Sequence, residues 1–151
     1  MKVIKLTQGY STIVDDKDFY IVKKYKWHAE NHLESIRVYG WVDGKSVTLS
    51  NLLLNPQKGM EVDHINGNPL DNRRENLRVC THAENMFNKK IYKNNSSGIK
   101  GIYFDNRKNR WCAQLIKNNK KVFRKTYKSK TEASEGYKNA AHLYFGKYER
   151  L

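Results

Sequence analysis

The sequence predicts an α+β fold in two parts. The first is a β-rich segment followed by a hairpin-plus-helix core, and the second is a three-stranded antiparallel sheet backed by a helix. Three observations predict this. Short runs of alternating apolar and polar residues, separated by turn formers, indicate strands in both halves. A polar stretch of small residues separates the halves. A long run near the C-terminus carries an apolar stripe at helical spacing.

The expected domains are residues 1–93, a linker at 94–98, and residues 99–151. Within the first domain, residues 1–59 form the β-rich part and residues 60–93 the core. A hydrophobic content of 38% with 12% aromatic residues suffices for a packed fold. The net charge of +14 indicates a polyanionic partner: DNA, RNA or an acidic membrane surface. The chain has neither an apolar run near the roughly 18 residues of a membrane span nor a signal-peptide core, so we expect a soluble intracellular protein.

The β-rich part contains several short elements. We expect strands at VIKL and YSTIV around a turn at Gln8-Gly9, and a helix at KDFYIVKKY that Asp15 and Asp16 cap. Strands IRVYGWV and KSVTL follow, joined by an Asp-Gly turn, and a helical turn comes next at residues 50–54. We interpret three aromatic residues as a small core rather than a surface for stacking nucleic-acid bases. These are Trp27, Tyr39 and Trp41.

The core segment, residues 61–88, places a carboxylate, an imidazole and amides at fixed spacings. Residues 61–65 form a strand that stops at Asn-Gly-Asn-Pro, and residues 77–80 return as a second strand. Thr81 and Glu84 form a capping box for a helix that runs to about residue 92. This hairpin and helix would bring Asp63 and His64 against Asn85.

These residue types suit metal-assisted hydrolysis. The carboxylate of Asp63 and the amide oxygen of Asn85 are hard ligands that suit Mg²⁺ or another divalent ion such as Mn²⁺, with further ligands from water and phosphate. His64, whose unperturbed pKa is about 6.5, can take a proton from an attacking water near neutral pH. The implied reaction is hydrolysis of a phosphodiester.

The spacing carries a resemblance. Asp63-His64 is followed by Asn76 twelve residues on and by Asn85 nine residues further, and Asn76 lies within the sequence LDNRRENLR at residues 70–78. The segment resembles the ββα-metal core of HNH endonucleases, in the H-N-N variant of phage-type homing enzymes. The resemblance implies that Asp63 and Asn85 bind the metal, that His64 is the general base, and that Asn76 braces the loop by hydrogen bonds. His82 has no matching role. Ser50-Asn51 replaces a histidine-arginine pair that often precedes the core.

The second half is strongly basic. Residues 88–128 contain thirteen Lys or Arg and one acid, Asp105, a net charge of +12. With interleaved aromatic residues, this balance favours nucleic-acid binding over a merely solvated face. We expect strands at residues 100–104, 110–117 and 120–127, then a helix from Thr131-Glu132 to about Phe145. Trp111 should share a sheet face with Ala113 and Leu115, against that helix.

This half resembles the APETALA-two/ethylene-response-factor type of DNA-binding domain. The resemblance lies in Gly101-Ile102, Trp111-Cys112-Ala113, the TEAS helix start and the segment from Tyr137 to Gly146. It implies that the open face of the sheet lies in the DNA major groove. The residues expected to face DNA are Lys100, Tyr103, Gln114, Lys121, Phe123 and Lys125. Those expected near phosphates are Arg107, Lys108, Arg110 and Arg124.

Three functions follow as hypotheses. The first is a Mg²⁺-dependent, site-recognising endonuclease of the homing type. It would act on double-stranded DNA as a monomer or homodimer, with no membrane partner, in the cytoplasm of a bacterial or phage-infected cell. The second is a DNA-binding regulator whose nuclease core is catalytically silent. The third is a basic RNA-binding protein that shows no metal dependence.

Overall fold

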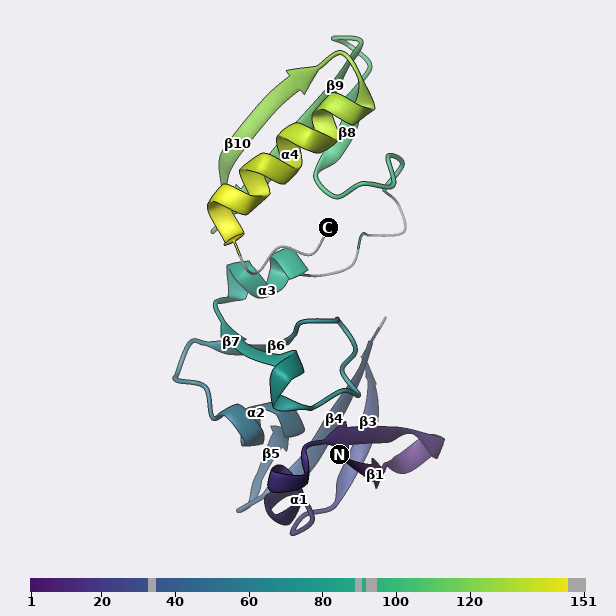
Figure 1. Cartoon of the computed structure of the whole chain (residues 1–151), viewed down its shortest axis with the longest axis vertical. Helices are drawn as coiled ribbons and strands as arrows, with labels where there is room; N and C mark the ends of the chain where they lie inside the picture. Colours follow the sequence, from purple (N-terminus) through teal and green to yellow (C-terminus); the bar gives the residue numbers. More distant parts are fainter. Residues whose placement is uncertain (33–34, 89–90, 92–94, 147–151) are drawn as a thin grey trace. The chain divides into compact units, whose positions relative to one another are not determined.

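The computed structural model describes residues 1–32, 35–88, 91 and 95–146 of the chain (Figure 1). It consists of two compact units, Met1–Asn85 and Met86–Leu151. This division comes earlier than the expected boundary at residue 93, because the last residues of the core helix pack with the second unit. Residues 95–98, expected to belong to a linker, form a turn in which Asn95 Oδ1 accepts hydrogen bonds from the backbone N–H groups of Ser97 and Gly98.

The first unit opens with an antiparallel hairpin of β1 (Lys2–Lys5) and β2 (Ser11–Val14). The connecting turn, η1 (Thr7–Gly9), contains positive φ angles at Gln8 and Gly9. Helix α1 (Asp16–Val22) follows, as the sequence predicts. Its N-cap residue Asp15 makes no side-chain capping bond. Instead, Asp15 Oδ2 accepts a hydrogen bond from the backbone N–H of Arg74, so it ties the N-terminal segment to the core.

A three-stranded sheet follows, in the order β3 (Trp27–His32), β4 (Ser35–Val42) and β5 (Lys45–Thr48). The sequence predicts β4 and β5 but not β3, whose polar composition hides its alternation. Asp43 and Gly44 both have positive φ, 49° and 77°, as a tight hairpin turn requires. Helix α2 (Leu49–Leu54) then begins at Thr48, whose side chain accepts a hydrogen bond from the N–H of Asn51.

The expected aromatic core is correct for Trp27 and wrong for Trp41. Trp27 is buried, and its Nε1 donates to the carbonyl of Val22 at 2.9 Å. Its ring lies against Gly40, where a Cβ would come within 2.8 Å of the ring, so only glycine fits there. Because side chains alternate along β4, Tyr39 and Trp41 point to the opposite face from Gly40. Trp41 is 66% exposed as a result.

The core hairpin pairs β6 (Glu61–His64) with β7 (Leu77–Cys80), in a register that sets Asp63 opposite Arg78. Leu77 is buried in the core of the first unit with Val14 and Leu49, and Val62 packs against it. Between the strands, η2 (Arg74–Asn76) forms one short helical turn.

Helix α3 (His82–Asn88) follows the hairpin. Its capping box is confirmed, because Thr81 Oγ1 accepts from the N–H of Glu84 at 3.3 Å while Glu84 Oε2 accepts from the N–H of Thr81 at 2.8 Å. The expected end of this helix near residue 92 lies outside the described residues.

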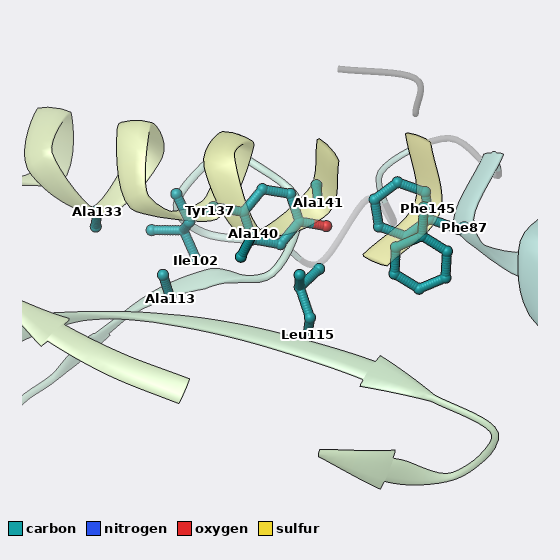
Figure 2. Packing of buried hydrophobic residues seen from close by; sticks show 9 residues of the cluster. All are labelled: Phe87, Ile102, Ala113, Leu115, Ala133, Tyr137, Ala140, Ala141 and Phe145. Carbon is teal, nitrogen blue, oxygen red and sulfur yellow. The ribbon is translucent and has the colours of Figure 1, made fainter. Parts of the chain in front are cut away.

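The second unit is an antiparallel sheet in the order β10 (Lys120–Tyr127), β9 (Arg110–Lys117) and β8 (Ile102–Asp105). Helix α4 (Lys130–Phe145) runs along one face of it (Figure 1). Figure 2 shows small and aromatic side chains of the helix pointing at Ala113 and Leu115 of the sheet, as predicted. At the end of this core the rings of Phe87 and Phe145 stack, with centroids 3.9 Å apart.

One irregularity in this sheet changes which residues face outward. The pairing of β10 with β9 shifts between Lys121, opposite Ile116, and Phe123, opposite Leu115. The extra residue is a β-bulge, which reverses the alternation after it. Phe123 therefore joins the helix-covered face, where it packs against the core.

Candidate active site

Asp63 lies in the middle of the hairpin face that the sequence predicts to be catalytic. It is only 6% exposed, and Arg78 from the paired strand donates to its Oδ2 from Nε at 2.9 Å and from Nη2 at 2.7 Å. This ion pair holds the carboxylate of Asp63 in place on the hairpin.

Glu61 links Asp63 to helix α3. It lies two residues before Asp63 on β6, so the two carboxylates point to the same face of the hairpin. Its Oε2 accepts from Asn85 Nδ2 at 2.5 Å, and its Oε1 lies 2.7 Å from His82 Nδ1. The structure therefore brings Asn85 to the same hairpin face as Asp63. Since the Asn85 nitrogen is directed at Glu61, its amide oxygen is the atom left to act as a ligand.

His64 ends β6, and its side chain reaches the loop between the two strands. Its Nε2 lies 3.2 Å from Asn72 Oδ1, in the loop between the two strands. Burial lowers the pKa of His64 from its usual 6.5, and the hydrogen bond to Asn72 and the charges of Asp63 and Asp71 oppose this only in part. Burial therefore favours the neutral imidazole, which is the form that can accept a proton.

Asn76 braces the loop, as its expected role requires. The side chain is buried and bridges two backbone groups on opposite sides of the loop. Its Nδ2 donates to the carbonyl of Asp71 at 2.7 Å, and its Oδ1 accepts from the N–H of Asn66 at 2.9 Å. Its own carbonyl accepts from the N–H of Ile65 at 2.8 Å, next to His64. Asn76 thus holds the loop between β6 and β7 together.

The donor set fits a divalent metal such as Mg²⁺. Among the described residues, no cluster of three or more His, Cys, Asp or Glu forms a metal site. The expected metal site differs from such a cluster, since its protein ligands are one carboxylate, from Asp63 on β6, and one amide, from Asn85 on α3. Oxygen ligands of this type suit Mg²⁺, which takes its remaining ligands from water and phosphate. Asp63 and Asn85 would hold the ion.

Of the residues expected to meet DNA, several lie on the open face of the second sheet, opposite α4. Cross-strand pairing and alternation place Tyr103, Arg110, Gln114, Lys121 and Arg124 there. Arg107 is exposed in the turn between β8 and β9, as is Lys108.

Three other residues expected to meet DNA are placed differently. Phe123 and Lys125 lie on the helix-covered face, because the bulge reverses the alternation that the sequence suggests. Lys100 donates from Nζ to the carbonyls of Met86 and Phe87, so it caps the end of α3 instead of extending from the sheet.

Sequence reasoning overlooked four residues that contact the site: Thr12, Glu61, Asn72 and Arg78. Two of them carried a usable signal. Glu61 precedes Asp63 by two on a strand, and Arg78 lies opposite Asp63 once the hairpin register is drawn. Thr12 and Asn72 had no such signal, since their contacts depend on how the loop folds against β2.

Comparison with known proteins agrees with this segment. Residues 55–87 match the family model described as HNH endonuclease. Protein 3.8 of Escherichia phage T7 is 43% identical over 54 residues, which are 36% of this chain and 45% of that protein. An uncharacterized HNH endonuclease of Acanthamoeba polyphaga mimivirus is 33% identical over 87 residues, 58% of this chain and 44% of that protein.

The similarity covers only part of each of these relatives. The chain spans less than half the length of the curated relatives that it matches. No solved structure matches it. None of the helices in the described ranges is long and apolar enough to cross a membrane. The hairpin and helix that carry Asp63, His64, Asn76 and Asn85 thus lie in a segment that is similar to HNH endonucleases, and this similarity supports a nuclease.

Proposed function

We propose that the protein is a divalent-metal-dependent DNA endonuclease, of the homing type, that recognises its site through the second unit. The observation that carries the proposal is the shared hairpin face. Glu61 connects the helix residue Asn85 to the strand that holds Asp63, while His64 stands at the tip of that strand. These are the residue types and positions that the resemblance to the H-N-N nucleases implies.

In the proposed reaction, His64 accepts a proton from a water molecule, and the water oxygen attacks the phosphorus of a DNA phosphodiester. The bond from phosphorus to one sugar oxygen breaks, and that oxygen takes a proton from solvent. Asp63 and Asn85 would hold a divalent cation, which when bound would stabilise the negative charge of the transition state. Arg78 and Glu61 hold these two side chains in place.

The basic second unit supports DNA as the substrate. Its open sheet face carries Arg110, Lys121 and Arg124 beside the polar side chains of Tyr103 and Gln114, which together form a surface that can contact phosphates and base edges. Phosphate contacts of this kind predict affinity that falls steeply as salt rises.

Relaxation of a supercoiled plasmid tests the proposal. The wild-type protein should nick or linearise the plasmid with Mg²⁺ and not with EDTA. His64→Ala should slow cleavage about 10²- to 10⁴-fold, the usual contribution of a general base, and should still bind DNA. His142→Ala, an exposed histidine of α4, is the matched control and should cleave as wild type does. Equal cleavage by wild type and His64→Ala would contradict the proposal.

A catalytically silent DNA-binding regulator is the second candidate, and one observation favours it. The guanidinium of Arg78 already neutralises the buried Asp63, which is where a cation would bind. If this pair excludes the metal, the protein should bind duplex DNA tightly and leave the plasmid supercoiled at any Mg²⁺ concentration.

A further inference from the structure

We infer that Asn72, held by Thr12 of β2, is a positioning residue for His64. It fixes the imidazole as the tautomer with the proton on Nε2 and the lone pair on Nδ1. The inference rests on the proposed function only for its catalytic consequence, since the tautomer is a property of the protein alone. It assigns the base atom of the reaction to Nδ1 and gives the N-terminal hairpin a role in the active site.

The first step concerns which way the amide of Asn72 points. Its nitrogen lies 3.0 Å from the carbonyl oxygen of Pro69, which has no proton to give. The same nitrogen lies 2.9 Å from Thr12 Oγ1. The hydroxyl of Thr12 donates its proton to the carbonyl of Leu70 at 2.8 Å, so it faces Asn72 with a lone pair. Both partners are acceptors toward Asn72, and only the NH₂ group can satisfy them.

The second step follows for the histidine. With its NH₂ group directed at Pro69 and Thr12, Asn72 presents its carbonyl oxygen to His64 Nε2 at 3.2 Å. An amide oxygen can only accept, so Nε2 must carry the proton. In a neutral imidazole the other nitrogen then holds the lone pair. Proton transfer from water can therefore go only to Nδ1.

The third step concerns how firmly Asn72 is held. Asn72 is 1% exposed and Thr12 is fully buried, so neither has an alternative partner in water. The backbone N–H of Asn72 donates to the carbonyl of Ile13 at 2.9 Å, and the N–H of Ile13 donates to Leu70 at 3.0 Å. The loop thus pairs with β2 through both backbone groups of Ile13, the residue after Thr12. Rotating the amide would leave buried acceptors facing one another, at a cost of about 1–3 kcal/mol for each lost partner.

Nitrogen NMR of the protein with ¹⁵N-labelled histidine tests the tautomer directly. At a pH where the ring is neutral, His64 should show a protonated, pyrrole-type Nε2 and a pyridine-type Nδ1 in the wild type. Asn72→Ala should move both resonances toward a mixture of tautomers. Asn139→Ala, which removes an exposed asparagine of α4, should leave them unchanged. A pyrrole-type Nδ1 in the wild type would overturn the inference.

Single-turnover cleavage tests the consequence. Asn72→Ala should lose about 10- to 100-fold in rate, as removal of a group that orients an active-site histidine does, with unchanged affinity for DNA and Mg²⁺. Thr12→Val should produce a smaller loss, and Thr12→Ser, which keeps the hydroxyl, should restore the rate. If Asn72→Ala does not fold, the comparison of Thr12→Val with Thr12→Ser tests the positioning role. Rates equal to wild type in Asn72→Ala, or in Thr12→Val, would contradict the positioning role. A wild-type protein with the expected tautomer and no cleavage would refute the proposed nuclease and leave the assignment of the tautomer standing.

Discussion

Replacement of Asn76 by alanine should loosen the loop that joins β6 to β7. The side chain satisfies two backbone groups, the carbonyl of Asp71 at 2.7 Å and the N–H of Asn66 at 2.9 Å. The bond to Asp71 is buried, so its loss leaves an unsatisfied group at a cost of about 1–3 kcal/mol. The bond to Asn66 is partly buried, and water can replace it in part, so its loss costs about 1 kcal/mol. The expected destabilisation of the first unit is therefore about 2–4 kcal/mol.

Urea unfolding of the full chain, followed by tryptophan fluorescence, would measure this loss, since Trp27 reports on the core of the first unit. Hydrogen exchange at the Asn66 amide gives a local measurement, and its protection should fall in Asn76→Ala. Asn139→Ala serves as the control for an exposed asparagine. A loss below about 0.5 kcal/mol, the level of an ordinary surface substitution, together with unchanged exchange at Asn66, would refute the bracing role.

Three further predictions concern charge and reactivity. Hydrogen bonds from Arg73 hold the pKa of Asp71 below its usual value, so the stabilisation by this carboxylate is present above about pH 4 and lost as pH falls through the lowered pKa. The difference in unfolding free energy between wild type and Asp71→Asn should therefore shrink on acidification. A difference that stays constant with pH would contradict the pairing of Asp71 with Arg73. Burial raises the pKa of Cys80 to about 11, so iodoacetamide near neutral pH should modify it only after unfolding, as mass spectrometry can show; rapid modification of the native protein would be inconsistent with this. Arg124→Ala and Lys125→Ala each remove one positive charge, but only Arg124 lies on the open sheet face. The slope of log affinity for DNA against log salt should therefore fall by about 1 for Arg124→Ala and by less for Lys125→Ala. Equal changes in slope would contradict DNA binding by the open sheet face.

Local signals in the sequence predicted most of the elements. Asp43-Gly44 specifies a hairpin turn by its φ angles, and the Thr81–Glu84 pair specifies a helix start, so both could be read from a few neighbouring residues. The core hairpin could be predicted for the same reason, because β6 and β7 are bounded by strong turn formers. In contrast, β3 has a polar composition and exists because it pairs with β4.

Features that depend on packing could not be predicted in this way. The bulge after Lys121 inverts the faces of Phe123 and Lys125, and a period-two pattern contains no sign of it. The partnership of Asn72 with His64 arises because the loop docks on Thr12, sixty residues away in sequence. The candidate site therefore divides into motif residues, for which we propose a catalytic role, and supporting residues that only the folded chain brings together.

Whether Asp63 and Asn85 share one cation is the central question, and anomalous diffraction answers it most directly. Crystals of His64→Ala with duplex DNA and Mn²⁺ would hold the complex before cleavage. We predict one anomalous peak that is bound by a carboxylate oxygen of Asp63 and the amide oxygen of Asn85, against a DNA phosphate. A peak bound by only one of these residues, or none at the hairpin while DNA is bound, would contradict the account.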